Sequence, residues 1–180
     1  ATPEEFKEHQ LTALEVEPHI VIDDGGDLVH RLHAERPELR ASCYGACEET
    51  TAGVIRNSAR EEAGTLEMPV IAVNNAQCKH LFDNRYGTGH STMDALMRST
   101  NRSITGAVLV VAGYGWCGKG IAARAAGMGA RVVVTEVDPV KALEAAHDGF
   151  WVMPMVEAAP MGDFFVTTTG TKRIISGAHF

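Results

Sequence analysis

Three glycines in the middle of the chain have the spacing of a dinucleotide-binding turn. Gly113, Gly115 and Gly118 form the pattern Gly-x-Gly-x-x-Gly. In such a turn the first glycine permits a tight bend, the second lets a pyrophosphate approach the backbone, and the third lets a helix pack against a strand. A helix opening around Cys117 would point unsatisfied N–H groups at the phosphates. The candidate cofactor contacts in this stretch are Gly113, Gly115, Trp116, Cys117, Gly118, Lys119 and Gly120.

An acidic residue lies where such a site needs one. Glu136 follows Gly118 by 18 residues and ends an apolar run, so its carboxylate could accept hydrogen bonds from both ribose hydroxyls. Its charge would repel a 2′-phosphate, which favours NAD over NADP. Lys141 could pair with Glu136 or contact a ribose, and an ordinary tight turn without a cofactor is the structural alternative. A P-loop is excluded because Gly120, not Ser or Thr, follows Lys119.

A second candidate group lies upstream of the glycines. Lys79 and Asp83 are four residues apart, so on a helix they share a face and can form an ion pair. Such a pair could transfer protons in a reaction, or it could be a solvated surface pair. Desolvation and pairing shift the pKa of a lysine in opposite directions, and the sequence leaves the net direction open.

Alternating helix and strand patterns indicate how these residues are positioned. The alternation predicts an α/β protein with a doubly wound parallel sheet of the Rossmann type. Gly87-Thr88-Gly89 is expected to interrupt two ordered stretches, which divides the chain into residues 1–85 and 86–180. The expected helices cover 3–14, 28–35, 50–63, 91–99, 118–127, 139–146 and 156–159, and the expected strands cover 20–22, 69–73, 108–111, 131–136, 151–153 and 164–166.

Composition excludes several classes of function. The 180 residues carry a formal net charge of −7, which argues against nonspecific nucleic-acid binding. No apolar run approaches the ~20 residues that cross a bilayer, so we expect a cytoplasmic protein without membrane contact. The cysteines are expected to be free thiols, and neither they nor the histidines have the spacing of metal ligands, so no metal is expected. The four cysteines are Cys43, Cys47, Cys78 and Cys117.

Six short strings, in order and spacing, resemble the S-adenosylhomocysteine hydrolase family. The likeness extends from about Ile20 to Phe180, and a generic dehydrogenase would share the glycine turn but not the Asp-Asp-Gly-Gly or Lys-x-x-x-Asp-Asn strings. The resemblance therefore implies an NAD-binding domain preceded by part of an α/β substrate-binding domain. The strings are Asp23 to Leu28, Glu48 to Thr51, Lys79 to Gly87, Gly113 to Gly120, Thr135 to Pro139 and Val166 to Gly170.

The resemblance also implies a reaction. Members of this family use tightly held NAD to oxidise the ribose 3′-hydroxyl of S-adenosylhomocysteine, eliminate homocysteine, add water and reduce the ketone again. Oxidation acidifies the neighbouring C4′ proton, which is why a redox cofactor can serve an elimination. The products are adenosine and homocysteine. The resemblance also implies a homo-oligomer, which is a tetramer in this family.

Residue roles follow from the same resemblance. Lys79 and Asp83 would hold the ribose hydroxyls and take part in proton transfer, and Asn84 would reach toward the nicotinamide. Asp24 and Glu49 fill the remaining catalytic acid positions, where they would also contact substrate. The implied cofactor contacts outside the glycine turn are Thr50, Thr51, Asn84, Glu136, Lys141, Thr168 and Thr169.

Simpler roles compete for four of these residues. Asp24 could cap the helix after the Gly-rich loop, and Glu49 could favour the first turn of its helix through the dipole. For Thr168 and Thr169 the competing explanation is β-propensity at a strand end.

The chain also departs from the family. Members are more than twice as long, so we expect this chain by itself not to be an active hydrolase. A catalytically silent NAD-binding regulatory homologue and a conventional NAD-dependent dehydrogenase are the alternative functions. The substitutions relative to the family pattern fall at Ala52, Asn75, Cys78, Thr88, Lys141 and Arg173.

Overall fold

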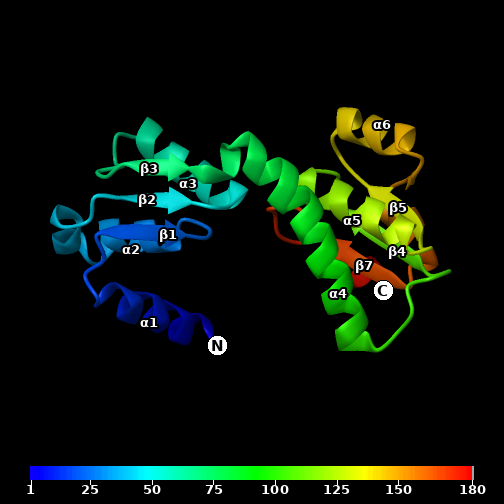
Figure 1. The fold of residues 1–180 in the computed structure, drawn as a ribbon, viewed down its shortest axis with the longest axis horizontal. Coiled ribbons are helices and arrows are strands. Elements are labelled where there is room, and N and C mark those ends of the chain that lie inside the picture. The colour runs from blue at the N-terminus through cyan, green and yellow to red at the C-terminus, as the bar shows by residue number, and fades with distance from the viewer. Residues whose placement is uncertain (180) are drawn as a thin grey trace. The chain divides into compact units, whose positions relative to one another are not determined.

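A computed structural model describes residues 1–179. The chain divides into two compact units, Ala1–Ala76 and Gln77–Phe180. Each unit contains a parallel β-sheet with helices packed against it (Figure 1). The α/β class expected from the alternating patterns is therefore confirmed. No helix among the described residues is long and apolar enough to span a membrane.

The first unit is built on a three-stranded parallel sheet. The strands β1 (Ile20–Asp23), β2 (Gly45–Glu48) and β3 (Val70–Ala72) lie in that order across the sheet. The helices are α1 (Pro3–Leu14), α2 (Asp27–Ala34) and α3 (Thr51–Glu62), with the short 3-10 helices η1 (Pro37–Ala41) and η2 (Val73–Asn75).

Helix α1 and strand β2 show where sequence patterns succeed and fail in this unit. Helix α1 begins as predicted after Thr2, whose side chain accepts a hydrogen bond from the Glu5 N–H in a capping box. Strand β2 was not predicted, because its sequence Gly-Ala-Cys-Glu has no β-branched residue. It forms the centre of the sheet because both of its edges pair, with β1 and with β3.

The second unit has the sheet order of a Rossmann fold. Strands β4 (Val108–Ala112), β5 (Arg131–Thr135), β6 (Trp151–Val152) and β7 (Phe164–Thr167) are all parallel, in the order β6-β5-β4-β7. The chain reverses its direction of winding between β4 and β7, where such sheets bind ligands. Every residue of β4 is buried, as expected for a central strand covered on both faces.

Helices of the second unit cover both faces of its sheet. They are α4 (Thr88–Thr100), α5 (Trp116–Gly127), α6 (Pro139–His147) and α7 (Met155–Ala158), with the short 3-10 helices η4 (Ala159–Met161) and η5 (Gly177–His179). One buried cluster includes Leu109 and Val111 of β4 with Ile121 of α5, and a second contains Val110 and Val133. Strand β4 therefore contributes side chains to both layers of the core.

The predicted interruption at Gly87-Thr88-Gly89 is wrong. A π-helix, η3 (Lys79–Gly87), runs directly into α4, and the helical conformation is continuous over residues 77–100. Gly87 has helical backbone angles, φ −62° and ψ −52°. A side chain at Gly89 would lie 2.5 Å from the Gly120 carbonyl oxygen. Gly89 therefore permits close packing on α5, and neither glycine breaks the helix.

Gly120 makes a close backbone contact between α5 and η3. A Cβ atom at Gly120 would overlap the backbone carbonyl of Arg85, whereas a Cβ atom at Gly127, in the same helix, would meet nothing within 4 Å. The helix backbones approach closely at Gly120 because no side chain separates them. This contact fixes η3 against the helix that follows the glycine turn.

We predict opposite effects of alanine at these two glycines of α5. Gly120→Ala should destabilise the second unit by about 1–3 kcal/mol, because overpacking forces the backbone apart. Gly127→Ala should be neutral or stabilising by up to ~1 kcal/mol, because alanine is the better helix former. Both tryptophans, Trp116 and Trp151, lie in this unit, so denaturant unfolding followed by tryptophan fluorescence reports on it. Equal stability of the two variants would contradict the packing described here.

Candidate functional site

The glycine turn follows β4 and leaves room for a ligand at one position. Gly113 has φ +103°, in the left-handed region that favours glycine, and a Cβ atom there would lie 2.8 Å from the Thr168 hydroxyl oxygen. A Cβ atom at Gly118 would overlap the Gly113 carbonyl oxygen, so this glycine brings α5 against the turn. A Cβ atom at Gly115 would meet no protein atom within 4 Å. Gly113 and Gly118 thus perform the steric roles predicted for them, whereas the approach of a pyrophosphate to Gly115 stays a prediction that the open space allows.

Helix α5 starts inside this turn, at Trp116, so its N-terminal N–H groups lie at the carboxyl end of β4. The Trp116 ring stacks on His80, with centroids 4.8 Å apart, and the Cys117 thiol lies 3.7 Å from the Thr88 hydroxyl. The Lys119 ammonium pairs with Glu144 at 2.6 Å. The contacts predicted between these residues and a cofactor remain predictions.

Glu136 connects the glycine turn to the turn after β5. Its carboxylate accepts hydrogen bonds from the N–H groups of Tyr114 and Val137, both at 2.7 Å, and of Asp138 at 3.0 Å. Burial alone would raise the pKa of Glu136, but these backbone N–H groups and the nearby Lys141 charge lower it below the ordinary value of 4.5. The carboxylate is therefore charged and held in place at neutral pH.

A cavity of about 660 Å³ lies at the carboxyl ends of the strands beside Glu136. Its volume is in the range of small-molecule and cofactor sites. Gly113, Glu136 and Thr169 face one space, so the structure brings together three of the predicted cofactor residues. The lining residues are Ala112, Gly113, Thr135, Glu136, Val137, Val152, Met153, Pro154, Met155, Thr169, Thr171, Arg173 and Ile174.

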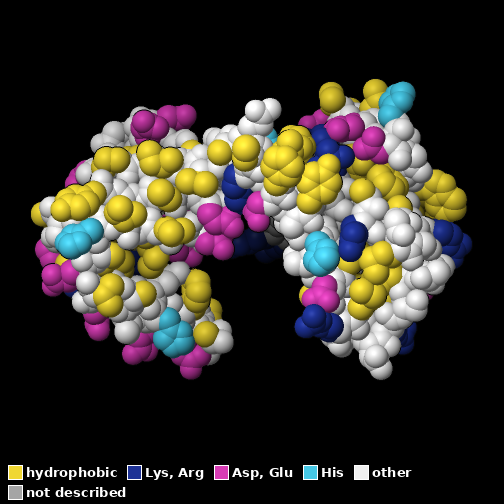
Figure 2. All heavy atoms as spheres, in the orientation of Figure 1, with side chains coloured by type: hydrophobic (Ala, Val, Ile, Leu, Met, Phe, Trp, Pro, Cys, Tyr) yellow, Lys and Arg dark blue, Asp and Glu magenta, His cyan; other side chains and the backbone are white. Residues whose placement is uncertain are grey.

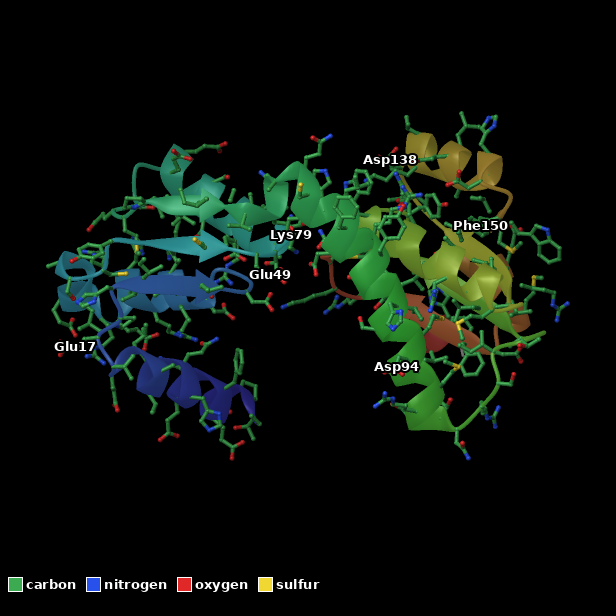
Figure 3. The ribbon with its side chains drawn as sticks, viewed as in Figure 1. Glu17, Glu49, Lys79, Asp94, Asp138 and Phe150 are labelled. Carbon is green, nitrogen blue, oxygen red and sulfur yellow. The ribbon has the colours of Figure 1, made fainter. Side chains whose placement is uncertain are left out.

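Thr168 and Lys141, two further predicted cofactor residues, do not line this cavity. The Thr168 hydroxyl lies 3.1 Å from the carbonyl oxygens of both Ala112 and Gly113, so it braces the glycine turn. Thr168 and Thr169 follow the last residue of β7, and the Thr168 N–H still donates to the Ala112 carbonyl oxygen of β4 at 2.9 Å. Strand propensity therefore stays an alternative explanation for Thr168. Lys141 pairs with Asp138, the N-cap of α6 that Figure 3 labels, at 3.5 Å.

The π-helix η3 brings Lys79, Asp83 and Asn84 together. Backbone hydrogen bonds in a π-helix join residues five apart, so side chains at i and i+5 lie one turn apart. The Lys79 ammonium donates to the Asn84 amide oxygen at 2.6 Å and pairs with the Asp83 carboxylate at 3.1 Å. The ion pair that the spacing allows is therefore present. Lys79, labelled in Figure 3, is only 15% exposed, whereas Asp83 is 61% exposed. The lysine is held in one position and shielded from water.

In the first unit, the predicted residues lie at the carboxyl ends of β1 and β2. Asp23 and Glu48 are register partners in these strands, so Asp24 and Glu49, which follow them, lie at the same edge of the sheet. Thr50 is the N-cap of α3, where its hydroxyl accepts from the Gly53 N–H at 3.1 Å. The Thr51 hydroxyl accepts from the Asn74 amide at 2.9 Å.

The competing role for Asp24, as the N-cap of α2, is wrong. The N-cap of α2 is Gly26, and the Val29 N–H in its first turn donates to Asp23, not to Asp24. Glu49 precedes the N-cap Thr50, and the first turn of α3 contains no acidic residue. Helix capping therefore does not explain Asp24, whereas a dipole interaction of Glu49, which lies next to the N-cap, stays an alternative.

Two buried acids that hold this edge together were not predicted as functional residues. Asp23 is 3% exposed, and its carboxylate accepts from the Asp24 and Val29 N–H groups. Glu48 is fully buried, and one of its oxygens accepts from the Gly25 and Thr50 N–H groups and from the Thr50 hydroxyl. Burial alternates with a period of two along each strand, so Asp23 and Glu48 fall on the same buried face as Val21 and Ala46. This alternation is the sequence pattern that could have identified the two acids.

We predict that removing the Glu136 charge lowers stability at neutral pH but not in acid. The folded-state pKa of Glu136 is depressed, so its contribution is present above the unfolded value near 4.5 and is lost as pH falls through the folded value. Glu136→Gln should therefore unfold more easily than the wild type at pH 7, by about 1–3 kcal/mol for hydrogen bonds to a charged group.

Denaturant titrations from pH 7 to pH 3 measure this difference, which should shrink below pH ~4.5. The exposed Glu157 of α7 provides the control, since Glu157→Gln removes an equal charge elsewhere on the unit. A stability gap that stayed constant or grew in acid would exclude the role described for Glu136.

Comparison with known proteins places the chain in a family. The family model described as "S-adenosyl-L-homocysteine hydrolase, NAD binding domain" matches residues 84–180. The chain is 59% identical over 177 residues to the adenosylhomocysteinase of Aquifex aeolicus and 55% identical over 179 residues to the S-inosyl-L-homocysteine hydrolase of Methanococcus maripaludis. These alignments cover 98% and 99% of this chain but 42% and 43% of the relatives.

Solved structures agree at the level of the fold. The dipicolinate synthase A chain of Bacillus subtilis superposes with a TM-score of 0.58 at 19% identity, covering 77% of this chain and 45% of that one. A phosphoglycerate oxidoreductase of Vibrio cholerae gives a TM-score of 0.53 at 14% identity, covering 91% of this chain and 56% of that one. With the Rossmann order β6-β5-β4-β7, the glycine turn and Glu136 already in place, the chain belongs to the S-adenosyl-L-homocysteine hydrolase family and contains its NAD-binding domain.

Proposed function

We propose that this chain forms the central part of an enzyme that reversibly hydrolyses S-adenosyl-L-homocysteine to adenosine and L-homocysteine. The observation that carries the proposal is the π-helical cluster of Lys79, Asp83 and Asn84, in a chain of this family. We assign residues 1–85 to the substrate-binding domain and residues 86–180 to the NAD-binding domain. Because the chain spans 42–43% of those relatives' length, we propose that it does not turn over substrate by itself.

The residues of the second unit fit NAD. The space at Gly115 accepts a pyrophosphate, and the charged Glu136 is placed to accept hydrogen bonds from ribose hydroxyls and to repel a 2′-phosphate. Thr168 and Thr169 border the same site from the end of β7. NAD, when bound, supplies the hydride acceptor for transient oxidation of the substrate's ribose 3′-hydroxyl.

Lys79 is the residue we propose to move the proton of the 3′-hydroxyl. Its ammonium already has two oxygen partners, Asn84 and Asp83, which fix the position of the nitrogen. In its neutral amine form, a nitrogen held in this way can accept the hydroxyl proton and become an ammonium, which returns the proton in the reverse step, provided that the hydroxyl lies within hydrogen-bond reach. Asp83, the more exposed partner, can accept a hydrogen bond from a neighbouring ribose hydroxyl. We propose that Asn84 orients Lys79 and extends toward the nicotinamide.

Residues at the carboxyl ends of β1 and β2 are also part of the proposed site. Asp24 and Glu49, one after each of two neighbouring strands, are proposed to contact substrate and to serve as catalytic acids or bases. The hydroxyls of Thr50 and Thr51 are proposed to contact the cofactor. The buried carboxylates of Asp23 and Glu48 would position these residues, because they bind the N–H groups of the two loops.

We also propose a cytoplasmic homo-oligomer that acts on small molecules and binds neither nucleic acid nor membrane. The net charge of −7 supports the exclusion of nucleic acid. The named relatives are an adenosylhomocysteinase and an S-inosyl-L-homocysteine hydrolase. The choice of S-adenosylhomocysteine over its deaminated relative is therefore part of the proposal.

The proposal predicts turnover when this chain is placed in a complete framework. A chimera of the Aquifex aeolicus adenosylhomocysteinase, with its matching segment replaced by this chain, should release homocysteine from S-adenosylhomocysteine, measured with a thiol reagent. Lys79→Ala and Asp83→Ala should each lower kcat about 10²–10⁴-fold, the usual effect of removing a proton-transfer group. Asp94→Ala, which removes an exposed carboxylate of α4 (Figure 3), should leave kcat unchanged.

Other outcomes distinguish the alternative functions. Nucleotide released by denaturation of the chimera reports whether NAD is bound. Bound NAD without homocysteine release would support a silent NAD-binding homologue, and steady NADH production from an alcohol would support a conventional dehydrogenase. Faster release from S-inosylhomocysteine than from S-adenosylhomocysteine would contradict the proposed base preference.

A further inference from the structure

A second hollow lies in the second unit among three helices. It occupies about 350 Å³ between η3, α4 and α5 and shares no lining residue with the cavity beside Glu136. Figure 2 shows Lys or Arg and His side chains side by side on this face of the unit. Apart from Gly120, a candidate cofactor contact, no residue proposed for the reaction lines this hollow. Its lining residues are Arg85, Tyr86, His90, Gly120, Ala123 and Arg124.

The hollow exists because two of its residues are small. Gly120 and Ala123 of α5 contribute little or no side chain to its lining, and Gly120 packs directly on the backbone of Arg85. The other lining side chains, Arg85 and Tyr86 of η3, His90 of α4 and Arg124 of α5, are long and polar at their tips. The result is a shallow space bordered by hydrogen-bond donors.

The positive charges of the hollow lack negative partners. Neither Arg85 nor Arg124 forms an ion pair with a carboxylate within residues 1–179. In contrast, other arginines of this acidic chain pair with carboxylates, among them Arg31, Arg36, Arg40, Arg56 and Arg98. Two guanidinium groups that line one hollow without a counter-charge create a positive potential there, which favours an anion.

His90 adds a donor. The Arg124 guanidinium lies 3.3 Å from Nδ1 of His90. Because arginine can only donate, Nδ1 acts as the acceptor, which leaves the proton of the neutral ring on Nε2. Nε2–H is then available to a ligand. On the other side, the Arg85 guanidinium lies 5.5 Å from the centroid of the Tyr86 ring, which restricts where the guanidinium can point.

We propose that this hollow binds the phosphate group of a small anion. Guanidinium groups match phosphate oxygens in two-pronged hydrogen bonds, and an imidazole N–H can complete the set. The volume is large enough for a mononucleotide. The Tyr86 ring is 59% exposed at the rim, where a base could stack on it. The shared chemistry is the phosphate group, and free phosphate or a nucleoside monophosphate could supply it.

Calorimetric titration of the NAD-saturated chain, in a phosphate-free buffer of low ionic strength, tests this proposal. Saturating NAD keeps the probes away from the cofactor site. Inorganic phosphate should bind with one saturable site, and the double variant Arg85→Gln/Arg124→Gln should bind it at least about tenfold more weakly, as expected for lost charge-assisted hydrogen bonds. Arg131→Gln, an exposed arginine at the start of β5, should bind like the wild type.

A single variant controls for the possibility that the double variant does not fold. Arg124 is exposed, so the single variant Arg124→Gln should fold normally and still bind phosphate more weakly than Arg131→Gln. No saturable phosphate binding by the wild type, or equal binding by wild type and double variant, would overturn the proposal. The second of these results would place any bound phosphate elsewhere, including at the glycine turn.

Adenosine 5′-monophosphate distinguishes the two sources of the phosphate group. Tighter binding than inorganic phosphate, lost in Tyr86→Ala, would identify a nucleotide whose base stacks on the ring. Equal affinity for both ligands, unaffected by Tyr86→Ala, would identify the phosphate group alone as the ligand. Failure of the chimera to release homocysteine would bear only on the proposed hydrolase, because neither ligand assay depends on turnover.

Discussion

The close approach of backbones along α5 is the constraint on which the second unit depends. At Gly118 the helix contacts the carbonyl of Gly113, and at Gly120 it contacts the carbonyl of Arg85. The same helix therefore positions the cofactor turn on one side and the π-helix that carries Lys79 on the other. Neither position has room for a Cβ atom, so only glycine at 118 and at 120 lets the backbone of α5 approach the turn and the π-helix this closely. A side chain at either position would move the turn or the lysine.

Hydrogen bonds and ion pairs hold the charged groups of the site in place, in addition to the close packing. The Glu136 carboxylate binds N–H groups on two separate turns, and the Lys79 ammonium is held by an amide oxygen and a carboxylate. In each case a charged group is held in place before any ligand arrives. Such preorganisation lowers the cost of binding and of proton transfer, because few groups need to be reoriented. The buried acids Asp23 and Glu48 serve the same purpose in the first unit.

Local signals made much of this architecture predictable. The apolar run before Gly113, the three glycines and Glu136 lie within one strand-helix-strand unit, and each has a direct steric or electrostatic reason. The π-helix was not predictable, because its hydrogen-bond pattern depends on packing against α5 and not on residue type. For the same reason Gly87 and Gly89 suggested a break, although the helix is continuous and Gly89 permits its close packing on Gly120. Strand β2 was missed because burial between two neighbours, and not β-propensity, makes it a strand.

Gly115 offers the most direct test of the claim that the turn after β4 binds the pyrophosphate of NAD. Its backbone is extended, with φ −76° and ψ −169°, and a Cβ atom there meets no protein atom within 4 Å. Calorimetric titration of NAD into the wild-type chain and the Gly115→Ala variant, with denaturant unfolding of both, measures affinity and stability separately. We expect stability to change by less than ~0.5 kcal/mol, as for surface substitutions, while NAD affinity falls at least about tenfold. Unchanged affinity in a stable variant would contradict the account.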